Sequence, residues 1–86
     1  MTAITGGLAC DSCGRPMSGP KEHGGGRADN PYCAHCTDRG GALLPYAEVH
    51  RYLVEREFMA RNGMERSQAE AAARNALSRM PAWKGT

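Results

Sequence analysis

The stretch that decides the fold of this chain is CDSCGRPMSGPKEHGGGRADNPYCAHC, residues 10–36. It begins and ends with a Cys-x-x-Cys pair, Cys10 with Cys13 and Cys33 with Cys36, and the sequence contains no other cysteine. Two such pairs at this separation are typical of a structural zinc site, in which four thiolates surround one ion as a tetrahedron. We therefore predict that Cys10, Cys13, Cys33 and Cys36 bind one Zn²⁺.

The composition of the same stretch explains why a metal would be needed. Residues 1–36 contain Ile4 and Leu8 as their only branched aliphatic side chains. A segment this poor in apolar side chains buries too little surface to fold alone, and a chain of 86 residues commonly needs an added staple. Structural zinc binding contributes about 10–16 kcal/mol in small peptides. We expect metal removal to unfold this segment and to leave later helices partly formed.

The four cysteines are also compatible with other chemistry. A four-thiolate site of the rubredoxin type holds iron, so Fe is the alternative metal. Disulfides would be expected in an oxidising compartment, but residues 1–8 lack the features of a secretory signal, and we expect a cytoplasmic protein. Oxidation of the thiolates with release of zinc is a further option, which no other feature of the sequence favours.

The predicted site argues against catalysis. Four sulfur ligands leave no coordination position for a water molecule, which hydrolytic zinc enzymes require. The Cys-x-x-Cys pairs lack the βαβ context of a thiol oxidoreductase, and no carboxylate pair or activated serine is recognisable. We predict that the chain is not an enzyme. His23, His35 and His50 are interpreted as solvent-facing residues or as neighbours of the ligands.

The order of these features predicts a small metal-stabilised α+β fold. We expect a flexible lead-in over residues 1–9, a zinc ribbon of short β-hairpins or knuckles over 10–44, a two-helix hairpin on or beside the ribbon over 45–83, and a tail over 84–86. No segment has the roughly 20 consecutive apolar residues of a membrane span, so no membrane association is expected.

Two helices are predicted after the ribbon. The first runs from Pro45, which suits the first helical position, to about Asn62, with Gly63 in the left-handed conformation after its end. The second runs from Gln68 to about Arg79, and Ser67 with Glu70 forms a capping box. Close packing of the two as an antiparallel pair is predicted from an apolar stripe on the second helix, made of Ala69, Ala72, Ala73, Ala76, Leu77 and Met80.

An interaction surface is predicted on the first helix. At 3.6 residues per turn, Val54 and Phe58 lie almost opposite the face that carries Tyr46, Val49 and Leu53. Such a helix is contacted on both sides. We therefore expect another protein to bind through Val54, Phe58 and Trp83, the last of which follows the end of the second helix.

Nucleic-acid binding is the alternative function. Zinc ribbons often serve the transcription machinery, and the two helices could imitate a helix-turn-helix with Arg74, Asn75 and Arg79 facing the groove. The charge balance favours this less, because the net charge is +2 and four thiolates with one Zn²⁺ add two negative charges. The zinc-loaded chain is then close to neutral.

The full pattern resembles a known family. Its parts are Cys10-x-x-Cys13-Gly14-Arg15-Pro16-Met17, a Gly- and Asp-bearing loop ending in Tyr32-Cys33-Ala34-His35-Cys36, a helix with Phe58-Met59 before Gly63-Met64, and Met80-Pro81-x-Trp83. This is similar to the small prokaryotic "putative zinc ribbon" family, in which a helical tail follows a four-cysteine ribbon. The resemblance implies one zinc bound by the four cysteines, and it implies no activity.

Overall fold

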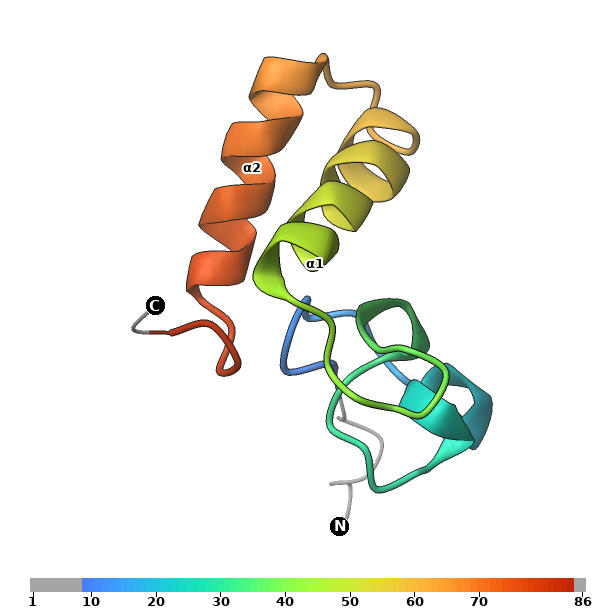
Figure 1. Ribbon diagram of the computed structural model, residues 1–86. Coiled ribbons are helices and arrows are strands. Elements are labelled where there is room, and N and C mark those ends of the chain that lie inside the picture. The colour runs from blue at the N-terminus through green and yellow to red at the C-terminus, as the bar shows by residue number, and fades with distance from the viewer. Residues whose placement is uncertain (1–8, 85–86) are drawn as a thin grey trace, which may run out of the picture.

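A ribbon and a pair of helices make up the molecule (Figure 1). The computed structural model describes residues 9–84, so the predicted lead-in falls almost wholly outside the described residues, as do two residues of the predicted tail. The ribbon lies at one end, and the two helices stand on it side by side and antiparallel. Within residues 9–84, no helix has the length and apolar character needed to cross a membrane.

The ribbon is built from turns. It contains three short 3₁₀ turns, η2 (Pro20–Glu22), η3 (Gly24–Gly26) and η4 (Ala34–Cys36). The β-hairpins predicted for residues 10–44 are not confirmed, because the described part of the chain forms isolated bridges in place of strands: Ala9 with Pro16, His23 with Cys33, and Thr37 with Leu43. The many Gly and Pro residues of this segment disfavour extended strands.

Polar side chains hold the ribbon where apolar ones are lacking. The Asn30 amide donates to the main-chain oxygens of Gly24 at 3.1 Å and Gly41 at 2.9 Å, and its oxygen accepts from the Tyr32 N–H at 3.0 Å. A Cβ atom at Gly24 would lie 2.4 Å from the Thr37 hydroxyl oxygen. One asparagine therefore ties three parts of the ribbon together, and Gly24 permits their close approach.

The first helix begins as predicted to within one residue. Helix α1 (Tyr46–Tyr52) continues directly into η5 (Leu53–Met59), and Pro45 is the capping residue before it, with φ −61° and ψ 153°. The predicted left-handed residue is confirmed, because Gly63 has φ +68° and its N–H donates to the Met59 carbonyl at 3.2 Å.

The second half of this helix differs from the prediction. Segment η5 is a π-helix, in which hydrogen bonds join residues five apart. Val54, the second residue of η5, is only 1% exposed and belongs to the core cluster that includes Ala69 and Ala73 of α2. The prediction of a free face containing Val54 is wrong, because α2 packs against η5 and buries this side chain. Phe58 stays partly exposed.

Helix α2 (Arg66–Ser78) begins two residues earlier than predicted. Glu65, with φ −79° and ψ 164°, is the capping residue, and its N–H donates to the Gln68 side chain at 3.4 Å. The predicted box of Ser67 and Glu70 is therefore wrong. Ser67 already lies inside the helix, where it cannot adopt the extended backbone of a capping residue.

One apolar core connects the ribbon to the helices. Ala69, Ala73 and Leu77 of α2 are fully buried, and they pack with Val49, Leu53 and Val54 of the α1–η5 helix, as the predicted alanine stripe requires. Small side chains let the two helix backbones approach closely. The same cluster continues into the ribbon through Met17 and the buried cysteines.

The helix contact can be tested with one pair of substitutions on α2. Ala73→Leu inserts a larger side chain at a fully buried position, whereas Ala71→Leu places the same side chain at an exposed one. We expect Ala73→Leu to lower the free energy of unfolding by about 1–3 kcal/mol, because it overpacks the interface. Denaturant unfolding at saturating zinc measures both variants. Equal stability of the two would contradict this packing.

Candidate metal centre

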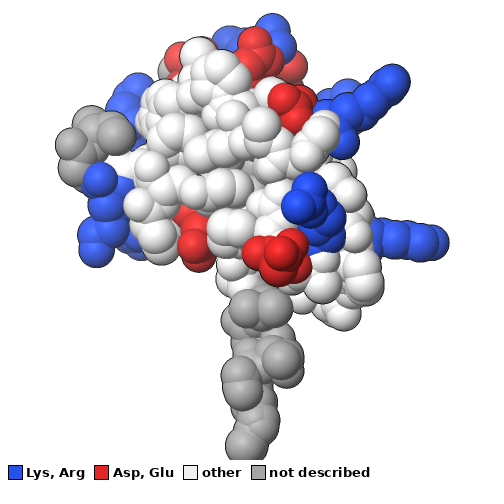
Figure 2. Space-filling view, turned by 60° about the horizontal axis from the view of Figure 1, so that its bottom comes forward, with Lys and Arg blue, Asp and Glu red and all other residues white. Residues whose placement is uncertain are grey.

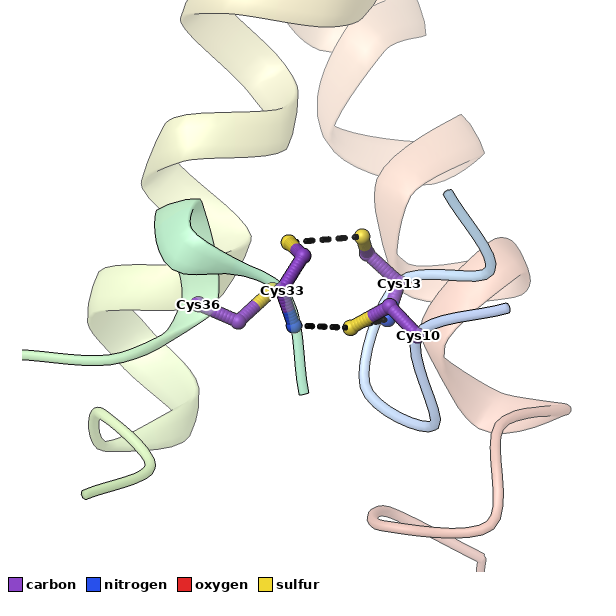
Figure 3. A group of neighbouring side chains, drawn as sticks. All are labelled: Cys10, Cys13, Cys33 and Cys36. Atoms are coloured by element: carbon purple, nitrogen blue, oxygen red, sulfur yellow. Dashed lines mark hydrogen bonds between the residues drawn. The ribbon is translucent and has the colours of Figure 1, made fainter. Parts of the chain in front are cut away.

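The structure brings all four cysteines of the two pairs together. The four sulfur atoms all lie within 4.8 Å of one another, and the side chains point toward a common centre (Figure 3). All four thiols are free, and the Cys13 and Cys33 sulfurs are 3.7 Å apart. With metal–sulfur bonds of about 2.3 Å, neighbouring sulfurs of a tetrahedral zinc site are about 3.8 Å apart. The spacing therefore fits a tetrahedral ion and is far too long for a disulfide.

The first pair lies on a tight knuckle. The Gly14 N–H donates to the Cys10 carbonyl at 2.8 Å, and the Cys10 N–H donates to the Arg15 carbonyl at 2.8 Å. Gly14 has φ +81°, a conformation that other residues rarely adopt. This confirms the need for glycine directly after Cys13, since the chain must reverse there to bring both sulfurs inward.

The second pair lies on η4. The Cys36 N–H donates to the Cys33 carbonyl at 3.0 Å, and the Thr37 hydroxyl donates to the same carbonyl at 3.1 Å. The Leu44 N–H then donates to the Cys36 carbonyl at 2.9 Å. After this turn the chain leaves in an extended conformation at Thr37, so the second knuckle does not require a glycine at that position.

Backbone N–H groups concentrate on one sulfur. Those of Ser12, Cys13 and Cys33 approach the Cys10 sulfur at 3.3, 3.4 and 3.1 Å. Because Cys33 belongs to the other knuckle, its N–H joins the two knuckles directly. Such donors stabilise a thiolate, since they offset part of its negative charge.

The sulfurs cannot all be charged without a cation. Hydrogen bonds, above all from the Cys13 thiol, hold the pKa of Cys10 far below its ordinary value. Hydrogen bonding to the Cys10 sulfur raises the pKa values of Cys13 and Cys36 far above theirs. Protons thus offset the mutual repulsion of the four sulfurs. A divalent cation can take over this role, so the donor set fits a metal ion.

The cluster is closed on most sides. Cys10, Cys33 and Cys36 are at most 2% exposed, while Cys13 is partly exposed. Among the described residues, this is the one group of three or more His, Cys, Asp or Glu side chains close enough together to hold a metal. A single ion bound to four sulfurs would leave no position for a catalytic water.

The three histidines stand outside this cluster. His23 is buried and its Nδ1 lies 2.7 Å from the Asn30 carbonyl, and the Nε2 of His50 lies 3.2 Å from the Glu70 carbonyl. His35 is largely exposed, and its ring stacks on Tyr52 with centroids 5.0 Å apart. Partial desolvation of the imidazole lowers the pKa of His35. Of the three, His35 faces solvent as predicted, whereas His23 is buried.

A contact beside the centre, between Trp83 and Ser12, was not predicted from the sequence. The Trp83 indole N–H donates to the main-chain oxygen of Ser12 at 3.1 Å and to its hydroxyl at 3.0 Å. Trp83 was expected to contribute to a partner surface, but its polar edge is directed at the first knuckle. The one available signal was a single tryptophan placed after the end of the last helix.

The fold and the four-sulfur centre define a zinc ribbon with an attached helical pair. The chain matches the family described as "Putative zinc ribbon domain" over residues 9–84, and it belongs to that family. The resemblance drawn from the cysteine motifs is thereby confirmed. No curated protein and no solved structure matches the chain. Zinc is the ion that the family's description names, and the sulfur geometry fits it.

Two substitutions in the second knuckle distinguish a metal ligand, Cys33, from a residue that only lies near the metal ligands, His35. We expect Cys33→Ala to weaken zinc binding by more than about 100-fold, because it removes one of four sulfur donors. His35→Ala, between Cys33 and Cys36 in sequence, should retain one zinc per chain, since its ring stacks on Tyr52 away from the cluster. Competition with a chromophoric chelator measures both affinities. Loss of zinc from the His35 variant alone would contradict this assignment.

Proposed function

We propose that this chain is a structural zinc-binding module that has no catalytic activity of its own and binds another protein. The observation that carries the proposal is a cleft of about 420 Å³ beside the metal centre. The closed set of four sulfurs supports a structural role for the metal, because it leaves no place for substrate or water on the ion.

The cleft lies between the first knuckle and the α1–η5 helix. Its apolar wall includes Tyr52, Leu53 and Phe58. Its charged residues are Arg15, Glu22, Glu57 and Arg61. Phe58 is one of the three residues that the sequence predicted for partner binding, and in the structure it lines this cleft. A partly exposed aromatic ring in a cleft is a common anchor for a partner's side chain.

The charges in the cleft indicate what would bind. Arg15 and Arg61 each reach the same carboxylate, Glu57, at 3.4 Å, and the side chain of Arg61 is 66% exposed. Glu57 thus pairs with both cations, Glu22 also lines the cleft, and ion pairs this exposed contribute little to stability. We infer that the partner presents an apolar side chain to Phe58 and a carboxylate to Arg61.

A charge-reversal pair tests the proposal. Arg61→Glu changes the cleft, whereas Arg74→Glu makes the same change on the exposed side of α2. In affinity capture from the source cell, we expect Arg61→Glu to lose a protein that the wild type and Arg74→Glu both retain, with one zinc per chain in all three. Equal recovery by Arg61→Glu would contradict binding at this cleft.

Nucleic-acid binding is the second candidate, because Arg74, Asn75 and Arg79 are exposed on and just after α2. Two observations favour it less. On the face shown in Figure 2, basic side chains are scattered among acidic ones. The connection over residues 60–65 is also longer than the usual three- or four-residue turn of a helix-turn-helix.

The same variants distinguish the two candidates. Nucleic-acid binding would be salt-dependent, because it releases counterions from phosphates. It would be weakened by Arg74→Glu, which leaves the cleft unchanged. We expect no binding of generic DNA or RNA by the wild type at about 50 mM salt. Binding that falls steeply with added salt and is lost in Arg74→Glu would favour the second candidate.

A further inference from the structure

We propose that Trp83 and Ser12 are positioning residues of the metal centre, through which the C-terminal segment 80–83 holds the first knuckle in its metal-binding conformation. The inference depends on metal binding by the four sulfurs. It does not depend on the proposed partner.

The contact joins the two ends of the described chain. In Figure 1 the dark red segment after α2 returns beside the blue first knuckle. The Trp83 indole N–H is shared between the two Ser12 oxygens, and the Ala82 N–H donates to the Asp11 carbonyl at 3.1 Å. Donors from the C-terminal segment therefore meet both residues that separate Cys10 from Cys13.

Ser12 is the connecting residue. It is fully buried, and its own N–H donates to the Cys10 sulfur at 3.3 Å. The Ser12 N–H thus faces the metal centre, and the Ser12 carbonyl faces Trp83. The Ser12 hydroxyl lies between the two, because it accepts from the indole and also hydrogen-bonds the Cys36 sulfur. Without the indole, these buried oxygens would lose their donor, and a buried unsatisfied polar group is costly. Trp83 therefore favours the backbone conformation in which Cys10 receives its hydrogen bonds.

Trp83 is itself fixed by the helices. The ring of Tyr46, at the start of α1, meets the Trp83 ring edge to face with centroids 5.3 Å apart. Met80 lies against the knuckle, because a Cβ atom at Gly14 would be 3.4 Å from its sulfur. The helical pair and the first knuckle are thereby coupled. Since such coupling is reciprocal, metal binding must also stabilise the C-terminal segment.

Substitution of the donor tests the role of Trp83. Trp83→Phe keeps an aromatic ring but removes the N–H, and we expect it to weaken zinc binding about 10-fold, as loss of a residue supporting metal ligands commonly does. Ser12→Ala should also weaken binding, because it removes the hydroxyl that meets both the indole and the Cys36 sulfur, while the main-chain oxygen remains as an acceptor for Trp83. Lys84→Ala, at the next position but exposed, is the control and should bind zinc as the wild type does.

A spectroscopic measurement separates positioning from general stability. The absorption bands of the Co²⁺-substituted protein report the geometry of the four sulfurs, and we expect them to shift in Trp83→Phe and not in Lys84→Ala. Zinc affinity of Trp83→Phe within twofold of the wild type would overturn the proposal. Weaker affinity with unchanged Co²⁺ bands would also overturn it, because the effect would then be one of stability alone.

The unmodified protein provides a test that does not depend on the folding of a variant. Trp83 is the single tryptophan, so tryptophan fluorescence reports the surroundings of this ring alone. We expect chelation of zinc to shift its emission to longer wavelength as the indole enters water, and added zinc to restore it. An emission spectrum that stays unchanged while bound zinc falls to zero would show that the centre and Trp83 are independent.

Discussion

The interaction on which the rest of this structure depends is the convergence of four sulfurs from two knuckles. Cys10 and Cys13 meet Cys33 and Cys36 across a gap that fits a tetrahedral ion. Without a cation, their charges would repel one another, and protons would have to occupy some of the sulfurs. The ribbon has little apolar material to offset that repulsion. The metal centre is therefore best understood as the element that closes the fold of residues 10–44.

The remaining structure extends outward from that centre. Asn30 and Thr37 tie the loops of the ribbon through hydrogen bonds, and the core of α1, η5 and α2 begins at the buried cysteines. The C-terminal segment returns to the first knuckle through Trp83. A small domain of this kind combines one metal, a polar network and a short apolar core, since none of the three alone is large enough. The cleft near Phe58 is a consequence of how the helix meets the ribbon.

The sequence predicted what depends on local spacing. Two Cys-x-x-Cys pairs, a glycine after Cys13 and a glycine after the first helix were sufficient to predict the centre and that helix end. The burial of Val54 could not be predicted, because it depends on α2 packing against η5, a contact between segments that the local spacing does not specify. The contact between Trp83 and Ser12 joins residues 71 positions apart, so no local pattern could indicate it. The β-hairpins were inferred from the ribbon as a class of fold, and turns take their place here.

The most direct test of this account is a zinc titration of the metal-free chain followed by amide NMR. We expect collapsed resonances for residues 10–44 without metal, and a single set of dispersed resonances that reaches full intensity at one equivalent of Zn²⁺. The ribbon would then owe its fold to the four sulfurs and their ion. The same dispersed spectrum in the absence of metal would contradict that claim.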